Sequence, residues 1–223
     1  IALASLTSST TVNVTPAYAP FSGSAITSPF AVTVRNQNGG NCSIAPIFVR
    51  GTAPVVMTNG SFNLTYDINY NGTPVVVIGS GLSGFYVTVG GNGSYTFNTY
   101  NVAIAANQTS AAACTFTDTQ MAIHLYAYRF GSWQLVRIYP LTINATVNKT
   151  CTMSAASPST LNFTSAIANG TPNPGVVLTS TLSNINCTFP SKITLSGSAL
   201  QRIPAVAAAP GFDSFINYKA AAV

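Results

Sequence analysis

The sequence predicts an all-β protein built as a β-sandwich. Apolar and polar residues alternate with a period of two over much of the chain, which is typical of strands that bury one face. Turn signals such as Asn71-Gly72 recur about every 8 to 12 residues. Helix formers are scarce, glutamate is absent, and no apolar period of 3.6 residues persists. Together these observations favour short strands joined by tight turns.

The alternation predicts three strand pairs in chain order. They span residues 68–77, 86–97 and 123–147, with turns at Asn71-Gly72, at 90–93 and at Gly131-Ser132. Asn-Gly and glycine-rich turns supply the positive φ angles that tight hairpins need. The third pair is the longest, because its second strand runs from Leu135 to Val147 and is rich in Ile, Val, Tyr and Thr.

A domain boundary is expected where this long strand ends, near Val147. We expect the first domain to span residues 1–147 and the second 148–223. The second is short for a sandwich and closes without a terminal pair of strands. It is therefore expected to be a fragment, or to lack strands that something else supplies.

The four cysteines indicate an exported protein. Their number is even and no C-x-x-C spacing occurs, which favours two disulfides formed in an oxidising compartment over a metal or redox site. Pairing within each domain would join Cys42 to Cys114 and Cys151 to Cys187, although four cysteines allow three connectivities.

Composition argues against an enzyme. The chain has three acidic residues (Asp67, Asp118 and Asp213), and His124 is its single histidine, so general acid–base chemistry has few carriers. No triad motif surrounds His124, and the spacing of the acids fits no metal site. We therefore expect no catalytic residues, no metal and no cofactor.

Two classes of partner are also excluded by pattern. The net charge is +5, but the eight Lys and Arg residues never cluster as a nucleic-acid site requires. The most apolar run, 75–89, is interrupted by glycines and is shorter than the roughly 20 residues of a membrane-spanning helix.

Apolar residues inside predicted turns are candidates for surface binding, because loops normally lie on the surface. Each of them has the alternative role of a strand end that packs inward. The candidates are Val55, Val56, Met57, Ala111, Ala112, Ala113, Phe130 and Trp133.

The second domain carries motifs of a known family. They are Cys151-Thr-Met-Ser-Ala, Leu161-Asn162-Phe163, Ile185-Asn186-Cys187-Thr188, Leu195-Ser-Gly, Arg202 and Phe215-Ile-Asn-Tyr218. This arrangement resembles the spore coat protein U family of pilin domains, which build the archaic (Csu-type) chaperone-usher pili. The strands at 124–128 and 133–147 look like the last strands of the same kind of sandwich. Thr164 departs from the family, which commonly has glycine there.

The resemblance implies a two-domain tip adhesin. Its fold would be two immunoglobulin-like β-sandwich domains, the second an incomplete pilin domain completed by a strand of the adjacent subunit. Such a protein is exported through the periplasm by a pilus chaperone and an outer-membrane usher and is displayed outside the cell at the pilus tip. It attaches bacteria to hydrophobic abiotic or host surfaces through apolar tip loops and supports biofilm formation.

Strand parity predicts which loops form that tip. If the strand 135–147 descends toward the linker, the turn at 130–133 lies at the far end. Counting back through alternating strands places 106–113 and 90–93 at the same end, followed by 71–73 and 51–55.

Two alternatives keep the same fold. A structural pilus or coat subunit would have no ligand of its own and would use residues 1–6 as a donor strand. A lectin would place polar and aromatic groups in a glycan pocket.

Overall fold

The computed structural model of this chain consists of β-strands and the turns between them, with no helix among the residues it describes. Those residues are 4–81, 85–108, 111–153, 167–168, 171–172, 185–190, 201–204 and 215–218. The chain divides into two compact units, one of 1–151 with 186–189 and one of 152–185 with 190–223. The prediction of an all-β chain is confirmed.

Twelve strands of the first unit form one continuous sheet. They are β1 (Ala4–Leu6), β2 (Thr11–Tyr18), β3 (Ile26–Asn36), β4 (Cys42–Arg50), β5 (Val56–Asn59), β6 (Phe62–Tyr70), β7 (Thr73–Pro74), β8 (Val76–Ile78), β9 (Val87–Val89), β10 (Ser94–Ile104), β11 (Thr115–Arg129) and β12 (Ser132–Val147). Their order is β1-β3-β10-β6-β5-β11-β12-β2, with β4, β7, β8 and β9 joined beside this path.

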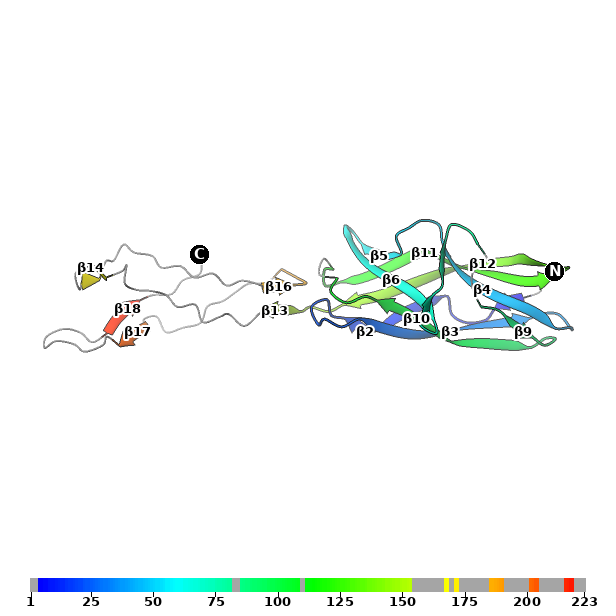
Figure 1. Cartoon of the computed structure of the whole chain (residues 1–223), viewed down its shortest axis with the longest axis horizontal. Coiled ribbons are helices and arrows are strands. Elements are labelled where there is room, and N and C mark those ends of the chain that lie inside the picture. The colour runs from blue at the N-terminus through cyan, green and yellow to red at the C-terminus, as the bar shows by residue number, and fades with distance from the viewer. Residues whose placement is uncertain are drawn as a thin grey trace. The chain divides into compact units, whose positions relative to one another are not determined.

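The sheet folds over a core so that β3 and β10 face β4 and β11 (Figure 1). Phe48 of β4 contacts Tyr100 of β10 with ring centroids 4.9 Å apart, and Phe30 of β3 at 5.8 Å, although neither strand pairs with β4. Along β11, Ile123 and Leu125 are fully buried, whereas His124 between them is only partly buried. The period of two thus selects the side chains that fill the sandwich.

Of the three predicted strand pairs, two are present and one is not. β11 and β12 form the long hairpin that was predicted. β6 and β7 form a hairpin at Asn71-Gly72, but it is short, because β8 crosses to pair with β4. The prediction of a hairpin at 86–97 is wrong: β9 pairs with β4 and β10 with β3 and β6, so the 90–93 turn connects strands that are not partners.

Strand register divides the connections of the first unit between two ends. We call one the hairpin end; it contains the connections 37–41, 90–93 and 130–131. We call the other the exit end; it contains the connections 19–25 and 105–114 and the residues 148–151 that follow β12. β11 spans the distance between them, about 50 Å at roughly 3.3 Å per residue.

The remaining strands are short. They are β13 (Cys151–Met153), β14 (Ile167–Ala168), β15 (Thr171–Pro172), β16 (Ile185–Cys187), β17 (Gln201–Pro204) and β18 (Phe215–Tyr218), paired as β13-β16, β14-β15 and β17-β18. Leu161-Asn162-Phe163, Thr164 and Leu195-Ser-Gly lie outside the described residues. The boundary at 147 and the incomplete second domain stay predictions.

Candidate functional site

The turn of the β11–β12 hairpin carries the most exposed large apolar side chain of the described residues. Phe130 is 94% exposed and has φ +48°, and Gly131 after it has φ +84°. Two successive positive φ angles identify a two-residue type I′ turn, whose first position favours asparagine or glycine. A left-handed conformation costs an L-residue about 1–2 kcal/mol, so folding alone does not account for phenylalanine here.

Beside this turn, aromatic side chains gather on the outer face of the sheet, the face opposite the core. Tyr128 and Trp133 are directly opposite in register, with ring centroids 5.5 Å apart in an edge-on arrangement. Tyr86 packs against Trp133 in the same manner at 5.5 Å. Tyr86 is 64% exposed and Tyr128 48%, so both rings offer apolar area to a partner.

Trp133 is only partly exposed and connects this aromatic group to the sheet. It packs against a small second cluster that β4 presents on its outer side, formed by Ala45, Ile47 and Val49. β4 can do this because its residues are apolar at both odd and even positions, so that Ile44 and Phe48 enter the main core while Ile47 faces outward.

The outer face stays apolar further along the hairpin. Leu135 lies opposite Tyr126, and Ile138 lies opposite His124. Directly opposite residues share a face, so Leu135 and Ile138, 46% and 51% exposed, extend the aromatic group. We call the resulting surface the outer patch, and it consists of Tyr86, Tyr128, Trp133, Leu135 and Ile138.

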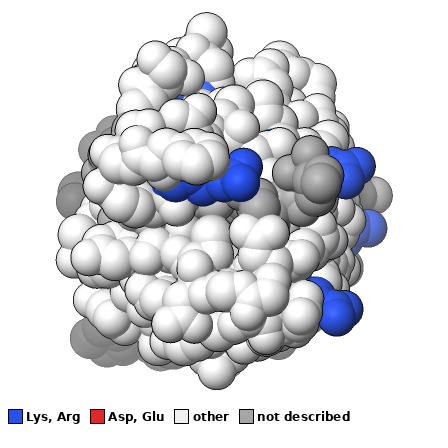
Figure 2. Space-filling view, turned by 90° about the vertical axis from the view of Figure 1, so that its right-hand side faces the viewer, with Lys and Arg blue, Asp and Glu red and all other residues white. Residues whose placement is uncertain are grey.

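The charges of the hairpin end are all positive. The Arg129 guanidinium lies 5.0 Å from the centre of the Phe130 ring, and that of Arg137 lies 5.3 Å from the Tyr139 ring. Arg35, also exposed, ends β3 at the same end. Figure 2, which looks onto this side of the molecule, shows Lys and Arg with no Asp or Glu in view.

The carboxylates of the described chain lie elsewhere. Asp67, which is exposed, pairs with Ala103 in the half of β10 nearer the exit end. Asp118 is 3% exposed and forms, with Arg50, the one ion pair recorded among the described residues. Arg129, Arg137 and Arg35 therefore have no carboxylate partner there.

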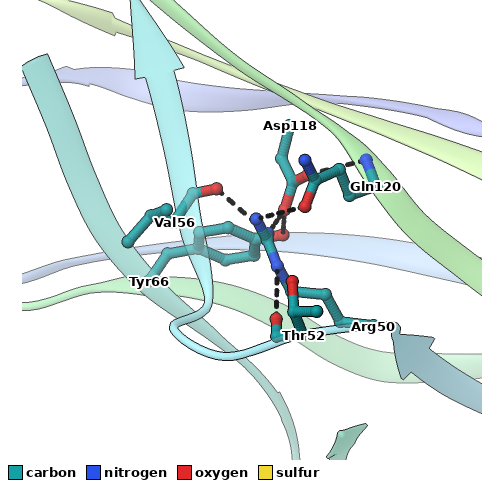
Figure 3. Close-up of polar contacts among 6 residues, drawn as sticks. All are labelled: Arg50, Thr52, Val56, Tyr66, Asp118 and Gln120. Atoms are coloured by element: carbon teal, nitrogen blue, oxygen red, sulfur yellow. Dashed lines mark hydrogen bonds and ion pairs between the residues drawn. The ribbon is translucent and has the colours of Figure 1, made fainter. Parts of the chain in front are cut away.

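Asp118 belongs to a closed network of polar groups (Figure 3). Its Oδ2 accepts hydrogen bonds from Arg50 Nη1 and from the Tyr66 hydroxyl, the latter at 2.7 Å. Its Oδ1 accepts one from the backbone N–H of Gln120 at 2.8 Å. Arg50 also donates to the carbonyls of Thr52 and Val56. Burial, and then the hydrogen bond to Asp118, raise the pKa of Tyr66.

This network ties the 51–55 connection to β11 and leaves Asp118 closed to a substrate. Both charged side chains are nearly inaccessible, 5% exposed for Arg50 and 1% for Asp118. Their donors and acceptors are turned toward each other and toward backbone carbonyls. We interpret the network as structural.

The predicted site residues separate into two groups. Phe130 and Trp133 lie together at the hairpin end. The others lie at the exit end or at the start of β5. Ala111 and Met57 are in the core, at 2% and 0% exposure. The remaining four are partly buried: Ala112, Ala113, Val55 and Val56. Met57 and Ala111 therefore cannot contact a surface, and for these two the inward-packing alternative is correct.

The expectation that 106–113 shares an end with 130–133 is also wrong. A single strand, β11, separates the two connections, and consecutive ends of one strand must lie at opposite ends of the sandwich. Register shifts inside β11, between Asp118 and Met121 and between Leu125 and Tyr126, interrupt its alternation without ending the strand. The 90–93 turn does lie at the hairpin end, since Gly93 accepts a hydrogen bond from Asn36.

Four members of the outer patch were not among the predicted site residues: Tyr86, Tyr128, Leu135 and Ile138. The sequence does carry a signal for three of them. Both β11 and β12 have apolar residues on both sides of the alternation, and a sandwich buries one face of each sheet, so one apolar face of this hairpin must lie outside the core.

One of the two predicted disulfides is present. Cys151 and Cys187 are bonded, with Cα atoms 4.1 Å apart. The predicted bond between Cys42 and Cys114 is wrong, because both are free thiols. Cys42 begins β4 at the hairpin end and Cys114 precedes β11 at the exit end, far beyond the roughly 7 Å that a disulfide spans. Burial raises the pKa of both thiols.

At the exit end, Thr188 fastens residues 186–189 to the rest of the first unit. Its carbonyl accepts a hydrogen bond from Ala113 N at 2.7 Å, and its amide donates to the Thr150 carbonyl at 3.0 Å. Its hydroxyl accepts from Thr150 N at 2.9 Å and donates to the Asn148 carbonyl at 2.8 Å. Thr188 is 6% exposed. We call this contact the Thr188 clasp.

Comparisons with known proteins yield no family. No family model matches the chain, and no curated protein matches it. Among solved structures, the ASH/PapD-like domain 7 of human CEP192 is similar at 8% identity and TM-score 0.38, covering 66% of this chain and 86% of that one.

Two further structures resemble the chain over about the same share. The C. elegans MSP family member WR4 has 8% identity and TM-score 0.31, with 66% of this chain and 100% of that one covered. A family 123 glycoside hydrolase from Clostridium perfringens has 11% identity and TM-score 0.33, with 65% and 27% covered. The fold described here rests on strand pairing and not on these likenesses.

The described residues contain no group of three or more His, Cys, Asp or Glu side chains placed to hold a metal ion. They also contain no helix of the length and apolarity needed to cross a membrane.

Proposed function

We propose that this protein is a non-enzymatic adhesin that attaches bacteria to apolar surfaces through the outer patch and Phe130. In this proposal it stands at the tip of an archaic (Csu-type) chaperone-usher pilus, outside the cell, and supports biofilm formation. The resemblance of residues 151–218 to spore coat protein U pilin domains supports the pilus assignment. The hairpin end supports the binding role.

Phe130 is the observation that carries the binding role. A turn that needs only positive φ angles would be more stable with asparagine or glycine. The chain instead has a bulky apolar side chain there, exposed over 94% of its surface. Backbone strain kept without a folding benefit is typical of functional positions.

The size of the apolar surface fits adhesion. Removal of apolar area from water is worth about 25 cal/mol per Å², or roughly 1.5–3 kcal/mol for a large side chain that becomes fully buried. The patch residues and Phe130 are already partly covered, so each would contribute less. Several contacts together suffice for adhesion when many pili act at once.

The assembly partners belong to the second unit. We propose that a periplasmic chaperone, an outer-membrane usher and then the adjacent pilus subunit engage residues 148–223, the last by donor-strand exchange. An incomplete sandwich exposes an apolar groove, and an added strand closes it. Residues 4–6 are an unsuitable donor, since β1 pairs with β3 of its own chain and Ala4 is buried. This weakens the alternative of a structural subunit.

Phe130→Asn tests the binding role without harming the fold. Asparagine suits the left-handed turn, so we expect the variant to be more stable by about 1 kcal/mol and yet to bind polystyrene at least tenfold more weakly. Phe130→Tyr should retain most of the binding. Phe62→Asn is the matched control, because Phe62 is 43% exposed beside the β5–β6 turn, away from the hairpin end.

The readouts are adsorption of the full chain to polystyrene beads and urea unfolding followed by fluorescence of Trp133, the single tryptophan. Unchanged adsorption of Phe130→Asn would contradict the proposal. A parallel glycan array examines the lectin alternative, and inhibition of adhesion by a free sugar would favour that alternative.

A further inference from the structure

We infer that the hairpin end prefers apolar solid material carrying fixed negative charge to neutral or cationic material of equal hydrophobicity. This inference deepens the proposed function and rests on it. It names the chemistry of the target: an apolar polymer with carboxylate, sulfonate or similar groups at its surface.

The first step is the position of the cations. Arg129 precedes Phe130 and its guanidinium lies over the Phe130 ring at 5.0 Å, so the most exposed apolar side chain has a charge beside it. Arg137 is not part of this arrangement, because it lies opposite the buried Leu125 and therefore on the core-side face of β12. A flat target that covers Phe130 meets the charge of Arg129 as well.

The second step is the absence of compensation. Within the described part of the chain, the one ion pair joins Arg50 to Asp118 in the interior. Asp67 lies toward the exit end. Among the described residues, Arg129 has no carboxylate partner that a target would have to displace.

The third step is desolvation. A neutral apolar target would strip water from the Arg129 guanidinium and return no partner, which opposes binding. An anionic group in the target would pair with this guanidinium at short range, where low dielectric strengthens the attraction. Arginine suits this role, because its planar guanidinium is weakly hydrated and stacks on aromatic rings.

A solid fits better than a bilayer. Within the patch, Tyr128, Trp133, Leu135 and Ile138 stand on paired strands, and Tyr86 packs on Trp133, so the patch is a side of a rigid hairpin. Bilayer binding favours apolar segments that sink into the acyl boundary, as amphipathic helices do. Here one apolar side chain, that of Phe130, is almost wholly exposed at the turn.

The experiment measures adsorption of the full chain to carboxylate-modified, unmodified and amine-modified polystyrene beads. Salt is varied from about 0.01 M to about 1 M, which shortens the screening length from about 30 Å to about 3 Å. We expect binding to carboxylated beads to exceed binding to aminated beads on the order of tenfold at low salt, and the difference to vanish at high salt.

Matched charge variants separate local from overall charge. Arg129→Gln should abolish the preference while binding to unmodified beads persists. Lys149→Gln is the control for one removed charge at the exit end of the first unit, and it should keep the preference.

Four results would overturn the inference. Equal binding to carboxylated and aminated beads at low salt would remove the anionic preference and leave the proposed function standing. Equal loss in the hairpin-end and control variants would assign the preference to net charge. Phosphatidylglycerol vesicles bound as tightly as carboxylated beads would indicate a membrane target instead. If no bead of any kind binds, both the inference and the proposed function fail.

Discussion

The exit end and the hairpin end of the first unit are made of the same kind of strand connections, yet their side chains are arranged in opposite ways. At the exit end Ala111 is buried, and Thr188 satisfies the backbone groups of Ala113 and Thr150. At the hairpin end Phe130 is exposed in a strained turn, and Arg129 has no carboxylate partner among the described residues. The difference teaches that the exit end is closed by internal contacts, whereas the hairpin end, for which we propose the binding role, leaves its side chains unsatisfied.

Of the substitutions considered, loss of the buried Arg50–Asp118 pair should lower the free energy of unfolding the most. Asp118→Ala leaves the Arg50 guanidinium buried without its counter-ion, and breaking such a pair costs about 3–5 kcal/mol of unfolding free energy. Urea unfolding followed by Trp133 fluorescence measures the loss. Asp67→Ala, at an exposed position, should change stability by less than about 0.5 kcal/mol. Equal effects of the two substitutions would contradict the structural interpretation of the network.

The Thr188 clasp should give the next largest effect. Thr188→Val keeps the shape of the side chain but removes the hydroxyl that serves Thr150 N and the Asn148 carbonyl, at a cost of about 1–2 kcal/mol. Thr188→Ser should restore most of the stability. Bead adsorption should be unchanged in both variants, since the clasp lies at the exit end. A loss of adsorption in Thr188→Val at full folding would break the assignment of the two roles to two ends.

The smallest effect concerns His124, which lies between Ile47 and Ile138 on the outer face. Burial lowers its pKa below the ordinary value of about 6.5. At mildly acidic pH the unfolded chain therefore binds a proton at His124 more readily than the folded chain does. The free energy of unfolding keeps its full value above about pH 6.5 and decreases as the pH falls through the lower pKa of the folded state.

His124→Gln should remove this part of the pH dependence. The measurement is the difference in melting temperature between about pH 7 and about pH 5. That difference should be smaller in the variant than in the natural protein, whereas Lys149→Gln at the exit end should leave it unchanged. An identical pH dependence in the natural protein and His124→Gln would contradict the expected role of burial.

Local patterns were sufficient to predict some of these features. The alternation of Ile123, Leu125 and Ala127 is a property of neighbouring residues, so the β11–β12 hairpin follows from it. Phe130 and Trp133 were predicted as candidates because they are apolar residues at the turn of this hairpin. Tyr86 was not, because it reaches the patch from another part of the chain, across β4.

Features that depend on the distance between remote residues were beyond the sequence. The sequence favours a disulfide between Cys42 and Cys114, but β11 separates the two residues by the length of the sandwich. Met57 looked like a loop residue, but the Arg50–Asp118 pair holds the preceding connection against β11 and Met57 enters the core.

The sequence by itself determined that this chain forms strands, that it has very few groups for catalysis, and that apolar residues outnumber the places in a core. Only the tertiary structure decided where the excess lies: on the outer face of one hairpin and at its turn, where Arg129 lies over the Phe130 ring and has no carboxylate partner among the described residues. The reason is physical. Strand formation follows from the order of adjacent side chains, whereas exposure depends on which strands meet, and register and crossover between sheets determine that.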